Sequence, residues 1–317
     1  MIIGIDIGGT NVRALIVEPE GALVVDRRRA SSSGNGPALV ATIVGLVDQL
    51  VTANHDFDRL NGIGLGVAGL AGRSGTLRWS PNLPEVVEFP LGPELEEKTG
   101  LSVTMTNDAS AAAWAEHQLG AGRDVDDFAM VTLGTGIGAG FVMGGRLLWG
   151  AEGYAGEVGH MLVARDGPFH HTGQQGPWEH FASGTALGRL GREAAAAGHF
   201  SVGLAMAESV DDIDGHHVGR AIAAGDPEAE GILEEFCREV ALGLSNLVVV
   251  LDPSRVVLGG GLSGIGEPLR AGVERWLGEV LPGSVHRPAV EVRLAELGDD
   301  AGAIGAALLA AEATAHD

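Results

Sequence analysis

The sequence has very little cysteine and lysine, and each shortage excludes a class of protein. Cys237 is the only cysteine among 317 residues, so no disulfide can form within the chain, which is typical of a reducing compartment. Lys98 is the only lysine, and its surroundings, Glu96–Gly100, predict a helix end with a glycine cap. A P-loop and a protein-kinase strand each need a lysine on the nucleotide phosphates. Any ATP bound here must therefore be held by backbone N–H groups, hydroxyls and metal.

Positive charge and long apolar runs are also scarce. Twenty Lys and Arg residues stand against 42 Asp and Glu, which gives a formal net charge of −22. Such a surface repels nucleic acid and anionic membranes. No apolar run approaches the roughly 20 residues of a membrane helix, and no basic region precedes an apolar one at the N-terminus. We therefore expect a cytoplasmic protein without a signal peptide that binds neither nucleic acid nor a membrane.

The residues that are present predict an α/β protein with two similar domains. Strand-like runs at Ile2–Asp6 and Val12–Val17 flank a glycine-rich turn, and the same arrangement returns at Phe128–Leu133 and Ile137–Met143. Apolar periodicity predicts helices between and after the strands. These expected helices are Leu39–Val51, Ala109–Leu119, Arg189–Ala207, Glu228–Leu251 and Ala301–Ala313.

The first glycine-rich turn is a candidate phosphate site. Gly8 and Gly9 let a backbone approach a polyphosphate, Thr10 can donate to a phosphate, and Asp6 could hold water on Mg²⁺. An ordinary hairpin turn is the alternative. The glycine-rich turn recurs at Gly134-Thr135-Gly136, and this recurrence favours a pair of phosphate-binding turns.

A second glycine pattern, Gly64-Leu65-Gly66-Val67-Ala68-Gly69, matches the dinucleotide-binding consensus, and we reject that interpretation. These glycines fall within a predicted strand and not in a turn that opens a helix. Close backbone packing is the simpler explanation, with Gly69 beside a ligand.

Asn107-Asp108 lies between a predicted strand and an alanine-rich helix. Both residue types are preferred as helix N-caps. A carboxylate at a helix start is also kept ionised by the helix dipole and can act as a general base. The two roles are compatible if Asn107 caps the helix and Asp108 faces a substrate.

A polar, glycine-flanked segment carries Glu157, His160 and Glu179. Carboxylates accept hydrogen bonds from hydroxyl groups, and imidazole donates or accepts, so the set suits a ligand covered in hydroxyls. A solvated loop is the alternative. Four of the eleven histidines lie here, namely His160, His170, His171 and His180, so metal binding is a further alternative.

In six motifs taken together, over nearly the whole length, the chain resembles the ROK family of bacterial sugar kinases, and its ATP-dependent glucokinases most closely. The motifs are Asp6–Thr10, Ser80–Pro84, Asn107–Ala109, Leu133–Gly138, Gly156–His160, and Glu179 with Ala182–Gly184. The resemblance implies an α/β, actin/hexokinase-like (ribonuclease H-like) fold of two domains around a cleft. We expect domains at 1–115 with 300–317 and at 116–299, the final helix returning to the first.

The resemblance also implies roles for individual residues. Asp108 would deprotonate the sugar 6-hydroxyl, and the sugar would be bound by Gly69, Asn82, Asn107, Asp108, Glu157, His160 and Glu179. ATP would be bound by Asp6, Gly8, Gly9, Thr10, Asn11, Gly134, Thr135, Gly136, Gly259, Gly260 and Gly261. Mg²⁺ would be held by Asp6 through water, and a homodimer is expected.

One departure from the family pattern concerns its structural zinc, which a histidine and three cysteines usually hold. Those positions are His160, His170, Thr172 and Pro177 here. Proline cannot ligate a metal and threonine is a poor zinc ligand, so we expect no zinc. A site rebuilt from the histidines is the alternative, as is hydrogen bonding that positions His160 without a metal.

Three alternatives to an ATP-dependent glucokinase remain. The sugar could be mannose, fructose, N-acetylmannosamine or N-acetylglucosamine, and the donor could be polyphosphate. A sugar-sensing ROK regulator would need a DNA-binding domain ahead of the first strand and a basic face, and the charge of −22 disfavours it.

Overall fold

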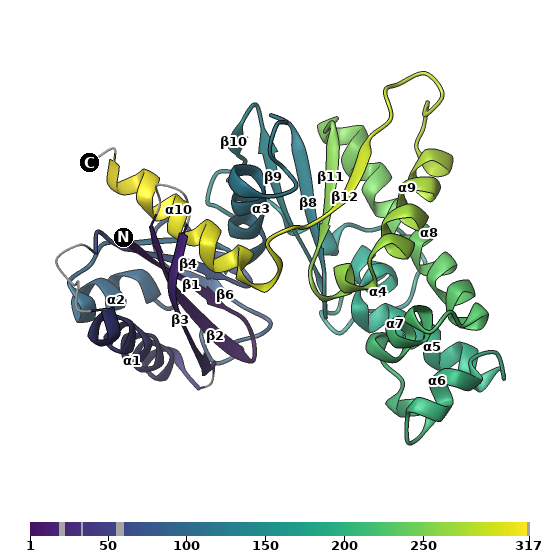
Figure 1. The fold of residues 1–317 in the computed structure, drawn as a ribbon, viewed down its shortest axis with the longest axis horizontal. Coiled ribbons are helices and arrows are strands. Elements are labelled where there is room, and N and C mark those ends of the chain that lie inside the picture. Colours follow the sequence, from purple (N-terminus) through teal and green to yellow (C-terminus); the bar gives the residue numbers. More distant parts are fainter. Residues whose placement is uncertain (19–22, 33, 55–59, 316–317) are drawn as a thin grey trace. The chain divides into compact units, whose positions relative to one another are not determined.

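The computed structural model describes residues 1–18, 23–32, 34–54 and 60–315 (Figure 1). The chain forms two compact units. The first comprises Met1–Asp126, Gly140–Gly156 and Glu296–Asp317, and the second comprises Asp127–Ala139 and Glu157–Ala295. These limits are not those of the domains expected from the sequence, 1–115 with 300–317 and 116–299, which stay a proposal.

The first unit is built on a five-stranded sheet with the order β3-β2-β1-β4-β7. β1 is antiparallel to β2, which is antiparallel to β3, whereas β1, β4 and β7 run parallel. A two-stranded sheet of β5 and β6 and four helices complete the unit. The bounds are β1 Ile2–Ile7, β2 Asn11–Glu18, β3 Leu23–Ser31, α1 Gly36–Asn54, β4 Ile63–Val67, β5 Leu70–Ala71, β6 Leu77–Trp79, α2 Leu91–Thr99, β7 Val103–Asn107, α3 Asp108–Leu119 and α10 Ala301–Ala315.

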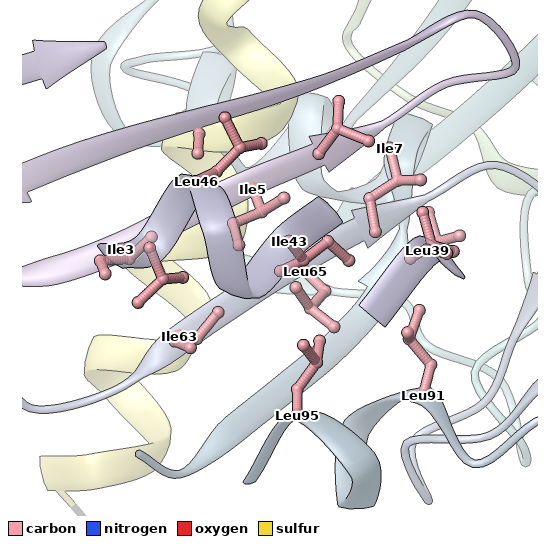
Figure 2. Close-up of a cluster of buried hydrophobic side chains, with 14 of the residues drawn as sticks. Ile3, Ile5, Ile7, Leu39, Ile43, Leu46, Ile63, Leu65, Leu91 and Leu95 are labelled. Carbon is pink, nitrogen blue, oxygen red and sulfur yellow. The ribbon is translucent and has the colours of Figure 1, made fainter. Parts of the chain in front are cut away.

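One face of this sheet carries a large hydrophobic core. Ile3, Ile5 and Ile7 alternate along β1, so all three side chains point to the same face. Figure 2 shows them with Leu39 and Ile43 of α1, within a cluster of fully or almost fully buried side chains. Burial of a side chain of this size stabilises a fold by about 1.5–3 kcal/mol.

The other face packs against α10, and glycines make the contact close. A Cβ atom on Gly4 of β1 would lie 2.0 Å from the carbonyl oxygen of Ala303, and one on Gly64 of β4 would lie 1.9 Å from that of Ala306. Figure 1 shows α10, in yellow, along these strands. Gly64 and Gly66 therefore serve strand–helix packing, and the rejection of a dinucleotide motif is confirmed.

By length and composition α1 could cross a membrane, which corrects the expectation that no apolar segment approaches such a length. Core helices of soluble proteins pass the same test. The buried residues of α1, Leu39 and Ile43 among them, pack in the core of the first unit. One such helix is weak evidence for a membrane span.

The second five-stranded sheet has the order β10-β9-β8-β11-β12, and β8, β11 and β12 run parallel. Its strands are β8 Phe128–Leu133, β9 Ile137–Met143, β10 Arg146–Leu147, β11 Arg255–Gly259 and β12 Glu291–Leu294. The helices of the second unit are α4 Trp178–Ala182, α5 Gly184–Ala196, α6 Ser201–Met206, α7 Gly215–Ala223, α8 Pro227–Leu251 and α9 Glu267–Val280. The side chain of Asp226 caps the start of the long helix α8, and Pro227 occupies its first helical position.

Most of the helices and strands expected from the sequence are present, and the prediction of one helix is wrong. The hairpin-like strand pairs at both glycine turns and the helices at Glu228–Leu251 and Ala301–Ala313 are confirmed. The single helix expected at Arg189–Ala207 is two helices, α5 and α6. Gly198 lies between them with φ +80°, a left-handed conformation that ends a helix.

Candidate active site

The turn between β1 and β2 brings predicted nucleotide and sugar residues together. Gly8 N–H donates to the Asn11 carbonyl at 3.0 Å, which closes the turn. A Cβ atom on Gly9 would lie 2.9 Å from Cβ of Asn82, so the two residues are in close contact. Thr10 is exposed beside them. The side chain of Asn11 instead accepts a hydrogen bond from Arg29 Nε at 3.0 Å, which ties β2 to β3.

Asp6, in β1, lies in an unusual electrostatic environment. Its pKa is raised to about 7, first by burial and then by the negative charge of Asp108, while Arg13 opposes the shift. The Arg13 guanidinium lies 3.6 Å from the carboxylate. The fold thus brings Asp108 close enough for its charge to raise the pKa of Asp6, although the two residues are 102 positions apart in the sequence.

Asn107 and Asp108 have different roles at the junction of β7 and α3. Asn107 Oδ1 accepts hydrogen bonds from the backbone N–H groups of Ala109 (2.9 Å) and Ser110 (3.2 Å), so Asn107 is the N-cap of α3. Its Nδ2 donates to the carbonyl oxygen of Gly69 at 3.3 Å. Asp108 is the first helical residue, and burial raises the pKa of its carboxyl. A raised pKa makes a carboxylate a stronger base.

Gly69 and Asn82 are held by the β5–β6 region. Gly69 has φ +108°, and a Cβ atom there would lie 2.4 Å from the carbonyl oxygen of Trp79, so no other residue fits. Asn82 follows the buried Ser80, whose hydroxyl accepts from Asn82 N–H at 3.3 Å. Gly69 thus lies beside Asn107, and Asn82 lies beside Gly9.

In the second unit, Glu157 precedes a single 3-10 turn, Val158–His160, of which His160 is the last residue. Glu157 Oε2 lies 3.8 Å from His160 Nε2, and about a third of each side chain is exposed. Gln174 contacts His160 twice: Oε1 lies 3.2 Å from Nδ1, and Nε2 donates to the His160 carbonyl oxygen at 2.6 Å.

Glu179, near the start of α4, connects this loop to the second glycine turn. Its Oε2 accepts from the Ile137 N–H at 2.7 Å, and its Oε1 lies 3.3 Å from His170 Nε2. A Cβ atom on Gly136 would lie 2.3 Å from the Oε2, and one on Gly159 would lie 3.2 Å from it. Glycine at both positions therefore makes room for the carboxylate.

The second glycine turn is itself tied to the start of α5. Gly134 N–H donates to the Gly136 carbonyl (3.0 Å), and Gly184 N–H donates to the Gly134 carbonyl (2.6 Å). The Thr185 hydroxyl donates to the Thr135 carbonyl at 2.8 Å, and the Thr135 side chain is exposed.

Gly259 is the last residue of β11, Gly260 and Gly261 follow it, and Gly259 and Gly260 pack against β8 near its end. Gly260 has φ +78°, and a Cβ atom there would lie 2.6 Å from the Leu133 carbonyl oxygen. A Cβ atom on Gly259 would lie 2.5 Å from the Met130 side chain. This turn therefore lies beside the end of the strand that leads into Gly134.

Comparison with known proteins identifies the family. The ROK family profile matches residues 2–313. The chain belongs to the ROK family. A glucokinase of Streptomyces coelicolor is 36% identical over 320 residues, covering 98% of both chains. An N-acetylmannosamine kinase of Escherichia fergusonii is 32% identical, covering 97% of both. A crystal structure of a ROK family glucokinase from Streptomyces griseus, in complex with glucose and AMPPNP, superimposes with a TM-score of 0.87 at 36% identity, covering 98% of this chain and 99% of that one.

These relatives confirm the fold class expected from the sequence. The ROK structures share the actin/hexokinase-like fold, and this member has two α/β units and two five-stranded sheets. The predicted site residues are now placed within each unit. Asp6, Gly9, Gly69, Asn82, Asn107 and Asp108 are neighbours in the first, and Gly134, Gly136, Glu157, His160 and Glu179 in the second.

Two of the four positions that the family resemblance assigns to zinc, Thr172 and Pro177, offer no suitable ligand side chain here. Thr172 Oγ1 is hydrogen-bonded to His170 Nδ1 at 3.0 Å, and Pro177 has no ligating atom. His160 Nδ1 faces the Gln174 oxygen. His170 also belongs to another cluster among the described residues, in which His170, His171 and Glu179 have ligand atoms within 4.8 Å of one another. Burial and the neighbouring His171 lower the pKa of His170.

Elemental analysis of the purified protein tests the zinc proposal. We expect no stoichiometric zinc, because two of the four positions offer no suitable ligand atom. The zinc content per chain is measured after purification with and without added zinc, each followed by dialysis. One tightly held zinc per chain, lost on substitution of His170→Ala but not of the distant His286→Ala, would show instead that the histidines have rebuilt a site.

Proposed function

We propose that this chain is a sugar kinase that transfers the γ-phosphoryl group of ATP to the 6-hydroxyl of glucose, with Asp108 as the general base. The observation that carries the proposal is the placement of Asp108. It is the first residue of α3, its carboxyl has a raised pKa, and the glycine turn Gly8–Thr10 lies in the same unit beside Asn82. The glucokinase relatives and the structure with glucose and AMPPNP support the choice of sugar and donor.

The reaction needs little covalent chemistry from the protein. The Asp108 carboxylate accepts the proton of the 6-hydroxyl as the hydroxyl oxygen attacks the γ-phosphorus. The bond from this phosphorus to the bridging oxygen breaks, and ADP leaves. Positioning and charge stabilisation supply most of the rate enhancement in such transfers.

Hydroxyl groups of the sugar are assigned to Gly69, Asn82, Asn107, Glu157, His160 and Glu179, besides Asp108. Asn107 has both of its oxygen's hydrogen bonds committed to the cap of α3, so only its amide N–H remains for a sugar oxygen. Glu179 keeps acceptor capacity on Oε1, because a carboxylate offers about four lone-pair sites.

The nucleotide phosphates are assigned to Gly8, Gly9, Thr10, Asn11, Gly134, Thr135 and Gly136, and the adenosine side to Gly259, Gly260 and Gly261. Asp6 suits a Mg²⁺ site, because the negative charges of Asp108 and Asp299, which help to raise the pKa of its carboxyl to about 7, would also attract a cation, against the opposing charge of Arg13 at 3.6 Å. Bound through water at Asp6, Mg²⁺ would neutralise charge on the phosphates. A homodimer remains a prediction from the family resemblance, and a cytoplasmic location remains a prediction from the sequence composition.

A coupled assay of ADP release tests this function. The purified protein is given ATP and Mg²⁺ with glucose, mannose, fructose, N-acetylmannosamine or N-acetylglucosamine, and with no sugar. We expect kcat/KM for glucose to exceed that for each N-acetylhexosamine by at least about tenfold, the discrimination that one misfitting substituent typically causes.

Preference for N-acetylmannosamine would support the second candidate, which the relatives at 32% identity favour. Polyphosphate in place of ATP tests the donor. Absence of sugar phosphorylation with either donor would exclude a kinase and favour a sugar sensor.

A further inference from the structure

The side chain of Gln174 contacts both the imidazole ring and the backbone carbonyl of His160. Gln174 Nε2 donates to the His160 carbonyl oxygen at 2.6 Å, and Gln174 Oε1 lies 3.2 Å from His160 Nδ1. A backbone carbonyl only accepts hydrogen bonds, so the amide NH₂ must face it. The amide oxygen must then face the ring, which fixes the orientation of this glutamine.

The orientation of Gln174 determines where the imidazole carries its hydrogen. An amide oxygen cannot donate, so His160 Nδ1 must be the N–H donor in this contact. In a neutral imidazole the other nitrogen, Nε2, is then an acceptor. It lies 3.8 Å from Glu157 Oε2, which is also an acceptor.

We propose that Gln174 is a positioning residue that holds His160 in the Nδ1–H tautomer, so that Nε2 and the Glu157 carboxylate form a pair of acceptors for two sugar hydroxyl groups. The assignment of a sugar to these residues rests on the proposed function. Gln174 therefore has a different effect on the histidine from that of a metal ion. A histidine bound to a metal through one nitrogen presents an N–H donor at the other, whereas His160 presents an acceptor.

The loop around Gln174 is ordered by its own backbone. His170 N–H donates to the Gln174 carbonyl at 2.8 Å, Val163 N–H donates to the Gly176 carbonyl at 3.0 Å, and Trp178 N–H donates to the Met161 carbonyl at 2.8 Å. These bonds fix the Gln174 backbone relative to the turn that carries His160.

The first test is the tautomer of His160, measured by nitrogen NMR of protein labelled in its histidine side chains. The His160 signals are assigned by their absence in His160→Asn. We expect Nδ1–H in the wild type and a shift toward Nε2–H in Gln174→Met, which has no amide. Gln175→Met is the matched control, because Gln175 is adjacent and exposed and no hydrogen bond joins its side chain to His160 among the bonds recorded for the described residues. An Nε2–H signal in the wild type, or an unchanged tautomer in Gln174→Met, would overturn the proposal.

The second test is steady-state kinetics with the preferred sugar. We expect Gln174→Met to raise the sugar KM about tenfold, as loss of one well-placed hydrogen bond typically does, and to change kcat and the KM for ATP by less than about threefold. Gln174→Glu keeps an acceptor facing Nδ1 and loses the donor to the carbonyl, so it should keep the tautomer and raise the sugar KM less. It also provides a second variant if Gln174→Met does not fold.

The two measurements separate this inference from the proposed function. The NMR result needs no turnover. A tautomer that depends on Gln174 in a protein that phosphorylates no sugar would refute the proposed function but leave the tautomer assignment standing. A tautomer change with an unchanged sugar KM in an active kinase would refute the acceptor role alone.

Discussion

Asp108→Asn should lower kcat for sugar phosphorylation by about 10²–10⁴-fold, the usual contribution of a general base. The asparagine has nearly the same size and can still accept a hydrogen bond from the sugar hydroxyl, but it cannot take the proton. The KM for sugar should therefore change by less than about threefold. The measurement is the ADP-release assay with the preferred sugar over a range of concentrations.

Folding should be nearly unaffected, which makes this substitution informative. Asn107, not Asp108, supplies the cap of α3, so the helix start is retained. Asp48→Asn is the matched control, since Asp48 is exposed on α1. Near-wild-type kcat in Asp108→Asn would refute the assignment of the base. Loss of kcat together with a cooperative unfolding transition at much lower temperature would point to a structural role instead.

Glu116→Ala should cause the largest loss of stability, about 3–5 kcal/mol of the free energy of unfolding. Glu116 lies in α3 and is 0% exposed. Its carboxylate accepts hydrogen bonds from three backbone N–H groups, those of Ala121 (2.7 Å), Glu296 (2.9 Å) and Leu297 (2.8 Å). A buried donor that loses its acceptor costs about 1–3 kcal/mol.

Chemical or thermal denaturation measures this effect, and a decrease in Tm of about 10 °C is expected for a protein of this size. Glu97→Ala is the matched control. Glu97 is exposed on α2 and its contact with Lys98 is a surface ion pair at 3.7 Å, which contributes little. A Tm for Glu116→Ala within about 2 °C of the control would mean that water satisfies these donors.

The residues at the ends of strands were accessible to sequence reasoning because local rules govern them. Alternating isoleucines in Ile2–Ile7, the glycines that follow, and an Asn-Asp pair before an alanine-rich helix each have one low-energy local structure. The strand β1, the N-cap of α3 and the C-terminal helix were predicted in this way.

Two of the features that the sequence did not reveal, the strand β3 and the break between α5 and α6, were missed for physical reasons that can be named. The strand β3, Leu23–Ser31, is rich in arginine, and it forms an edge of the sheet where charged side chains are suitable. Its Arg27 also pairs with Asp300 at 2.9 Å, from the far end of the sequence. The break between α5 and α6 was hidden because the alanine run before Gly198 favours a continuous helix.

The sequence by itself determined the family, the α/β class and the residue types of the candidate site, because these follow from short motifs with local physical meaning. Only the tertiary structure decided how those side chains are held. Glu116 meets Glu296 and Leu297 across 180 and 181 residues, burial and the Asp108 charge raise the pKa of Asp6, and Gln174 orients His160 across 14. Burial and long-range hydrogen bonds depend on which distant segments pack together, and no local pattern specifies that.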